Sequence, residues 1–86
     1  MKYKEERPFA KPEAAALELL RIVRAFIAAK NDPAVKHTYA GITNAEFIQR
    51  SGASVAEWSA GISYGTEHGW WTMDGGGRIF PSDTAP

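Results

Sequence analysis

The sequence predicts a small α+β domain, mainly α-helical, in which three helices are followed by a C-terminal β-hairpin. Three observations lead to this fold class. An apolar stripe with helical spacing follows Pro12, capping-box patterns begin at Thr43 and Ser54, and three consecutive glycines at 75–77 separate two β-prone runs. The 86 residues make one domain with a thin core, because a chain of this size buries only roughly 60–65% of its unfolded surface.

The first helix is expected over residues 12–30. Pro12 suits the first turn of a helix, and Glu13 favours its positive N-terminal end. Asn31-Asp32-Pro33 should end the helix, because the residue before a proline avoids the helical conformation. The apolar positions follow the i, i+3, i+4, i+7 spacing of an amphipathic helix: Ala16, Leu19, Leu20, Val23, Phe26 and Ile27.

A loop with a short strand at Thr38–Ile42 is expected next, followed by two capping boxes. Thr43-Asn44-Ala45-Glu46 fits this motif, and Ser54-Val55-Ala56-Glu57 fits it again. In a capping box the hydroxyl accepts from a backbone N–H three residues on, and the Glu side chain reaches back to the N–H of the cap. The two motifs predict two further helices that begin eleven residues apart.

The shorter of these helices is expected over 43–51, because Gly52 readily takes the left-handed conformation that closes a helix. The longer helix should run over about Val55–His68 and stop at Gly69. Residues 70–81 then fit two short strands around Asp74-Gly75-Gly76-Gly77, a tight turn that needs positive φ. The glycines lack the Gly-Lys-Ser/Thr of a phosphate loop, and the tryptophans beside them are interpreted as core residues.

Helix, short strand, short helix, turn, longer helix and hairpin, in this order, form a winged helix-turn-helix. We therefore predict a polar N-terminal arm at 1–11 and one winged-helix domain at 12–86. The stretch 52–71 is similar to the recognition half of many bacterial winged-helix regulators. The residues that carry this resemblance are Gly52, Ser54, Trp58, Ile62, Gly69, Trp70 and Trp71.

A narrower resemblance covers most of the chain. The segments RPFAKPEAAALELL (7–20), AEWSAGI (56–62) and HGWW (68–71) resemble a group of small bacterial proteins without an assigned activity. This resemblance implies the fold and the domain limits, and it implies no activity.

The fold analogy favours a DNA-binding module in transcription regulation. In a winged helix, the exposed face of the third helix enters the major groove. Here Ser59 and Ser63 are expected at the base edges of double-stranded DNA, with Arg50 and Arg78 on phosphates. A basic N-terminal arm could add further phosphate contacts through Lys2, Lys4, Arg7 and Lys11.

The distribution of charged residues favours a protein partner over DNA. The 10 Lys and Arg residues balance the 10 Asp and Glu residues, and residues 43–86 hold two arginines against five carboxylates. The expected recognition face holds no Arg, Lys, Asn or Gln to read bases: Val55, Ala56, Ser59, Ala60, Ser63 and Tyr64. The alternative is a protein-interaction module that offers this apolar or small-residue face to another protein or to a second copy.

Gly61 and Gly65 lie four residues apart on one face of the third helix. Each costs roughly 1 kcal/mol relative to alanine inside a helix, so a close approach of another group should offset the cost. Tight packing of the first helix is the preferred interpretation, and a docking groove for a partner is the alternative.

Catalytic chemistry is not expected. His37 and His68 fall in different elements, and the chain has no cysteine for a disulfide or a thiolate zinc site. Glu46, Glu57 and Ser54 are interpreted as capping residues rather than as acid–base or nucleophilic groups. We expect no metal and no small-molecule cofactor. A cytoplasmic protein without a membrane span is expected, since no apolar run approaches 18 residues and the N-terminus has no signal-peptide pattern.

Overall fold

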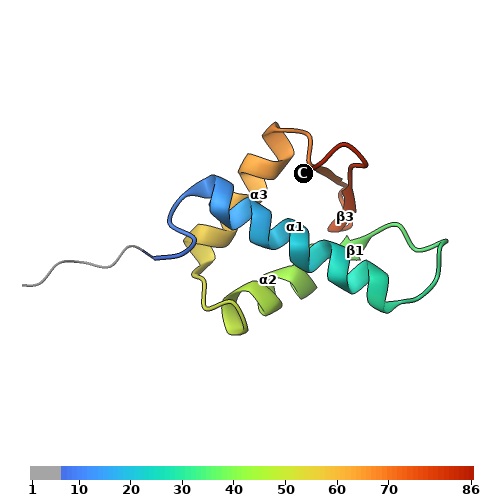
Figure 1. The fold of residues 1–86 in the computed structure, drawn as a ribbon, viewed down its shortest axis with the longest axis horizontal. Coiled ribbons are helices and arrows are strands. Elements are labelled where there is room, and N and C mark those ends of the chain that lie inside the picture. The colour runs from blue at the N-terminus through green and yellow to red at the C-terminus, as the bar shows by residue number, and fades with distance from the viewer. Residues whose placement is uncertain (1–6) are drawn as a thin grey trace, which may run out of the picture.

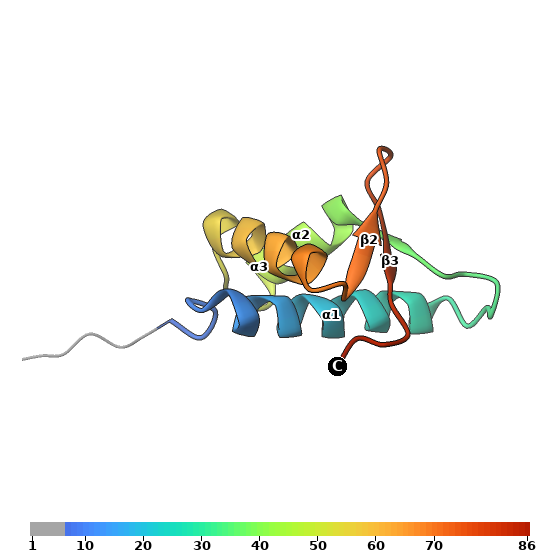
Figure 2. The same cartoon turned by 90° about the horizontal axis from the view of Figure 1, so that it is seen from above.

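A computed structural model describes residues 7–86 of the chain and has an α+β fold that is mainly helical (Figure 1). Its elements are α1 (Pro12–Ala29), β1 (Thr38–Tyr39), α2 (Ala40–Gln49), α3 (Val55–Glu67), β2 (Trp71–Met73) and β3 (Arg78–Pro81). α1 is the longest helix and packs against both α2 and α3, which lie together on the same side of it (Figure 2). The element order is compatible with the winged helix that the sequence predicts.

The three strands form one antiparallel sheet in the order β1-β3-β2. Thr72 lies opposite Phe80, and Tyr39 lies opposite Arg78. The predicted hairpin is confirmed, and its turn includes Gly77 at a φ of 82°. The hairpin projects away from α1 and stands beside α3 (Figure 2).

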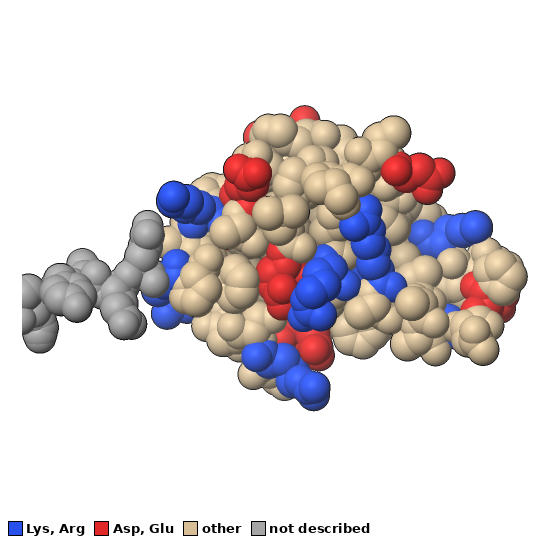
Figure 3. Space-filling model, viewed as in Figure 1, with Lys and Arg blue, Asp and Glu red and all other residues tan. Residues whose placement is uncertain are grey.

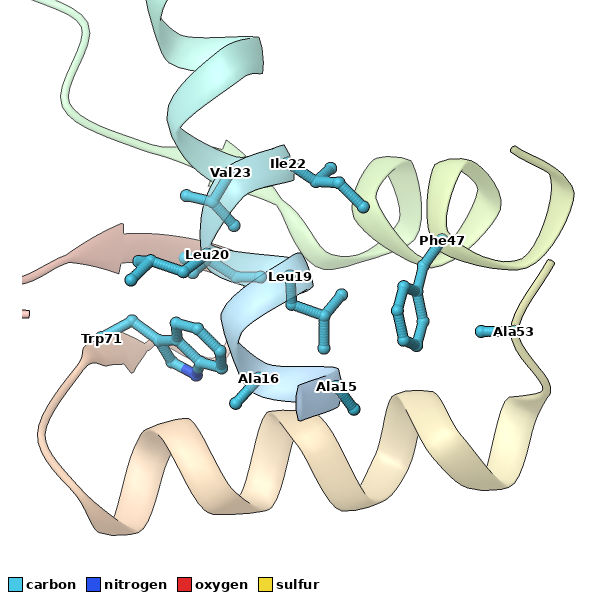
Figure 4. Close-up of a cluster of buried hydrophobic side chains, with 10 residues drawn as sticks. Ala15, Ala16, Leu19, Leu20, Ile22, Val23, Phe47, Ala53 and Trp71 are labelled. Atoms are coloured by element: carbon cyan, nitrogen blue, oxygen red, sulfur yellow. The ribbon is translucent and has the colours of Figure 1, made fainter. Parts of the chain in front are cut away.

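α1 is the central element of the core. The predicted apolar stripe is confirmed over most of its length, because α1 buries six residues against both other helices and the sheet. Phe26 and Ile27, at the end of the stripe, are half-buried. Figure 4 shows the core side chains between the elements: Ala15, Ala16, Leu19, Leu20, Ile22 and Val23 from α1, with Phe47, Ala53 and Trp71.

The start of α2 differs from the sequence prediction. The strand ends at Tyr39 rather than at Ile42, and α2 begins at Ala40, so Thr43 is not a helix cap. Thr43 is fully buried inside the first turns, where its hydroxyl donates to the carbonyl oxygen of Ala40 at 2.8 Å. The Ala40 N–H donates to the Gly77 carbonyl oxygen at 2.8 Å, so the neighbouring hairpin satisfies the first of the free N–H groups at the helix start. The first capping box was therefore a wrong prediction.

The second capping box is confirmed at the start of α3. The Ser54 hydroxyl accepts from the Glu57 N–H at 3.1 Å, and the Glu57 carboxylate accepts from the Ser54 N–H at 2.8 Å. Gly52 before the helix and Gly69 after it have φ values of 77° and 72°, as the sequence predicts for a turn and a helix stop. α3 ends at Glu67, one residue earlier than predicted.

The two helical glycines are both in close contact with the chain itself. A Cβ at Gly61 would lie 2.8 Å from Leu19 Cδ1 and 2.9 Å from Ala15 Cβ, so this glycine admits α1 as predicted. A Cβ at Gly65 would lie 2.2 Å from the ring of Trp71, so this glycine admits a side chain of β2 instead. Both positions are buried, and the docking-groove interpretation of these glycines was wrong.

The tryptophans contribute to the core as the sequence indicates. Trp71 is 1% exposed, and its indole N–H donates to the Thr66 hydroxyl at 3.1 Å. Trp70 is half-buried and packs edge-on against Tyr64, with ring centroids 5.3 Å apart. Trp58 is also half-buried against the core, and its indole N–H is buried without a hydrogen-bond partner among residues 7–86.

Candidate nucleic-acid interface

The exposed face of α3 carries the two serines that the sequence analysis placed there. Ser59 and Ser63 are both exposed, one helical turn apart. Val55, at the start of the same face, is 63% exposed, and Ala56 beside it is exposed as well. These four positions therefore carry short, uncharged side chains, whereas Tyr64 at the end of the expected face is half-buried and packs on His68 and Trp70.

Arg50 lies on another part of the molecule. It follows the last residue of α2, and its Nε lies 3.8 Å from the Glu46 carboxylate one turn earlier. Together with Arg21 and Phe26 it borders a hollow of about 210 Å³ between α1 and α2. The structure thus places Arg50 at the α1–α2 groove, and no hydrogen bond or ion pair joins it to Ser59 or Ser63 among the described residues.

Arg78, the first residue of β3, is held by the hairpin turn. Its Nε lies 2.6 Å from the Asp74 carboxylate, which also accepts from the backbone N–H groups of Arg78 and Gly76. These hydrogen bonds, the Arg78 backbone N–H first, keep the pKa of Asp74 below its ordinary value. The guanidinium lies over the Phe80 ring, 5.8 Å from its centroid. Arg78 is therefore paired with a carboxylate and oriented within its own hairpin.

Arg7 has a partner that the sequence does not predict. Its Nε lies 2.7 Å from one Glu57 oxygen and its terminal nitrogen 2.9 Å from the other, which is a bidentate ion pair. The same nitrogen donates to the Gly52 carbonyl oxygen at 3.1 Å. Of the other predicted arm residues, Lys11 is exposed, and Lys2 and Lys4 lie outside the described residues. The described end of the predicted arm thus contacts the domain.

The Arg7–Glu57 pair predicts a pH dependence of stability. Hydrogen bonds from Arg7 and from the Ser54 N–H lower the pKa of Glu57 from about 4.5 to about 2. Since the folded-state pKa lies below the unfolded one, this contribution is complete above about pH 4.5 and is lost as the pH falls toward about 2. We expect the stability difference between wild type and Glu57→Gln to shrink over that window, measured by thermal unfolding at stepped pH.

The matched control for this prediction is the same substitution made in an Arg7→Ala background. Most of the pH-dependent difference should then disappear, because the larger cause of the lowered pKa has been removed. A difference between wild type and Glu57→Gln that stays constant from neutral pH to pH 2 would contradict the prediction.

The two histidines belong to separate aromatic clusters. His37 packs against Tyr39 and Phe80, with ring centroids 5.3 and 5.2 Å apart. His68 stacks on Tyr64 at 3.9 Å, and its Nδ1 lies 2.9 Å from the Tyr64 carbonyl oxygen. Within residues 7–86, no three His, Asp or Glu side chains are grouped closely enough to hold a metal ion.

Charged side chains of both signs are interspersed on the face of the molecule drawn in Figure 3. On the face in Figure 3, basic groups lie beside acidic groups, and large areas between them are uncharged. None of the helices in the described part of the chain is both long and apolar enough to span a membrane. Comparisons with protein-family models, with curated proteins and with solved structures gave no match.

Proposed function

We propose that this chain is a winged-helix domain that acts as a protein-interaction module through the exposed face of α3. The observation that carries the proposal is the chemistry of that face. Val55, Ala56, Ser59 and Ser63 are exposed and uncharged, and Ala60 between them is half-buried. Because these side chains are short, a helix or strand of a partner protein can approach the backbone of α3 closely. Val55 is the most exposed apolar residue that it would contact.

The arginines support a protein partner rather than duplex DNA. Affinity for duplex DNA comes largely from cations that neutralise phosphates. Arg7, Arg50 and Arg78 each lie beside a carboxylate, at 2.7, 3.8 and 2.6 Å respectively. A phosphate that approached any of them would also meet the negative charge of that carboxylate.

Duplex DNA is the second candidate, because one observation favours it. The β2–β3 hairpin projects beside α3 on the side away from α1 (Figure 2). In winged-helix proteins that bind DNA, the third helix lies in the major groove while the wing contacts the adjacent backbone. On this hypothesis Ser59 and Ser63 contact base edges, and Arg50 and Arg78 contact phosphates.

A photo-crosslinking amino acid at Ser59 tests the protein-interaction proposal in cells. We expect a discrete crosslinked protein species that disappears when Val55→Asp is added, because burying an unpaired carboxylate against an apolar partner surface carries a large desolvation cost. The matched control carries the crosslinker at Leu17, which is 44% exposed on α1. Identical patterns from Ser59 and Leu17 would sink the proposal.

An amide NMR titration with mixed-sequence duplex DNA separates the two candidates. The protein-interaction proposal expects no salt-sensitive shifts over residues 55–63, even at low salt. Shifts at Ser59, Ser63 and Arg78 that vanish at high salt would instead establish the DNA candidate, because phosphate contacts weaken steeply with salt.

A further inference from the structure

Residues 7–9 occupy a surface site, called the seat below, that is formed by Gly52, Glu57 and Phe47, which are distant from them in the sequence. Arg7 reaches the Glu57 carboxylate at the start of α3 and the Gly52 carbonyl oxygen in the turn before it. Phe9 packs against Phe47 of α2, with ring centroids 5.1 Å apart and the rings tilted by 51°. The seat therefore joins a carboxylate, a backbone acceptor and an aromatic ring.

The segment that fills this seat has the form of a short bound peptide. Its two anchors, an arginine and an aromatic residue, are separated by Pro8, which restricts the backbone between them. The Ala10 N–H donates to the Arg7 carbonyl oxygen at 3.2 Å, and this turn closes the segment before α1 begins. A bidentate guanidinium–carboxylate pair gives directional specificity, and the ring contact adds apolar area.

The seat and its occupant differ in exposure. With Arg7 in place on its carboxylate, the Glu57 side chain is 10% exposed, and the Arg7 side chain that covers it is 56% exposed. Phe47 is fully buried, whereas Phe9 is half-buried. The carboxylate and the aromatic ring of the seat thus belong to α3 and α2, while the occupant lies outermost and is held by an exposed ion pair and a ring contact, which are individually weak.

We propose that this seat is a recognition site for an arginine-X-aromatic segment, which Arg7 and Phe9 occupy in cis and which a partner protein carrying the same pair occupies in trans. The inference rests on the proposed protein-interaction function and names the chemistry of one partner contact. Glu57 directly follows Ala56, so the segment enters at the N-terminal end of the α3 face. An arginine of the partner would replace Arg7 on the Glu57 carboxylate and form the same ion pair that the structure shows within the chain.

Competition between the two occupants makes the proposal testable. A tethered segment has an effective concentration in the millimolar range, so a free peptide binds the wild-type chain weakly. Removing the anchors in cis with Arg7→Ala/Phe9→Ala should therefore strengthen binding of a free peptide with the sequence of residues 4–11, KEERPFAK. We expect the peptide to bind this full-length variant at least tenfold more tightly than wild type, with amide shifts at Gly52 and Glu57.

Three controls test the chemistry of the site. A peptide with alanine in place of its arginine, or in place of its phenylalanine, should lose most of its affinity. Glu57→Gln added to the double variant should weaken binding of the original peptide, because the bidentate acceptor is lost. Circular dichroism tests whether each variant is folded. If the double variant unfolds, Arg7→Ala alone, which keeps the Phe9 contact, replaces it, and the affinity of the peptide for this variant should lie between those for wild type and for an emptied site.

The results that overturn the site are specific to it. Absence of shifts at Gly52 and Glu57 with millimolar peptide, in a folded variant, would overturn the proposal. Equal binding of the peptide that lacks arginine would also overturn it. Because the Ser59 crosslink reports the exposed α3 face and the peptide titration reports Gly52 and Glu57, failure of either can be told from failure of the other.

Discussion

Replacing Phe47 by alanine is expected to lower the free energy of unfolding by about 3–5 kcal/mol, the range for truncating a buried phenylalanine. Phe47 is 0% exposed, and Figure 4 shows its ring pointing from α2 into the space between the helices. The neighbouring rigid helices cannot fully close over the cavity that is left. Typical domains have only about 5–15 kcal/mol of stability, so this variant should be marginally folded. Urea unfolding followed by circular dichroism measures the loss.

Ile42→Ala is the matched control for this prediction. Ile42 lies in the same helix but is 44% exposed, so its truncation leaves no closed cavity. We expect a loss below about 1 kcal/mol, set by the smaller apolar area that is returned to water. Similar losses for Phe47→Ala and Ile42→Ala would show that α2 is not held by its buried ring.

The elements that could be predicted from the sequence depend on neighbouring residues. Three features depend only on residues that are close in the sequence, and all three appear in the structure. They are the apolar stripe of α1, the capping box at Ser54 and the hairpin turn at 74–77. The exposure of Ser59 and Ser63 also follows from helical spacing. For these features the local pattern is sufficient.

Thr43 shows why the same kind of pattern failed at α2. Its sequence context is as good a capping box as that of Ser54, yet the helix begins three residues earlier, at Ala40. The Ala40 N–H donates to the carbonyl oxygen of Gly77, which is 37 positions away in the sequence. Pairing of β1 with β3 therefore decides where the helix starts, and a local motif cannot report a partner at that distance.

The contacts of Arg7 could not be predicted from the sequence either, because they also join residues that are far apart in the chain. Arg7 and Glu57 are 50 residues apart, and Glu57 was already fully explained as a capping residue. In the structure the carboxylate serves both the Ser54 N–H and the Arg7 guanidinium. The one local signal was Phe9, an aromatic residue within a segment interpreted as a polar arm, and it packs on Phe47.

Gly65→Ala is expected to destabilise the domain by about 2 kcal/mol, although alanine is the better helix former by about 1 kcal/mol. The new Cβ would lie 2.2–2.5 Å from three ring atoms of Trp71. This ring cannot easily move aside, because it is 1% exposed and its N–H is bonded to Thr66. The control is Gly41→Ala in α2, where a Cβ meets nothing within 4 Å, and we expect a gain of up to about 1 kcal/mol.

A double-mutant cycle separates the ring contact from a general intolerance of Gly65. In a Trp71→Leu background, Gly65→Ala should be neutral or slightly stabilising, because the Cβ no longer meets an indole ring. The resulting coupling between the two positions should be about 2 kcal/mol, within the range for residues in direct contact. Additive losses would mean that the glycine is required by the helix itself. Strong coupling would mean that α3 has a glycine at this position because β2 places its tryptophan there.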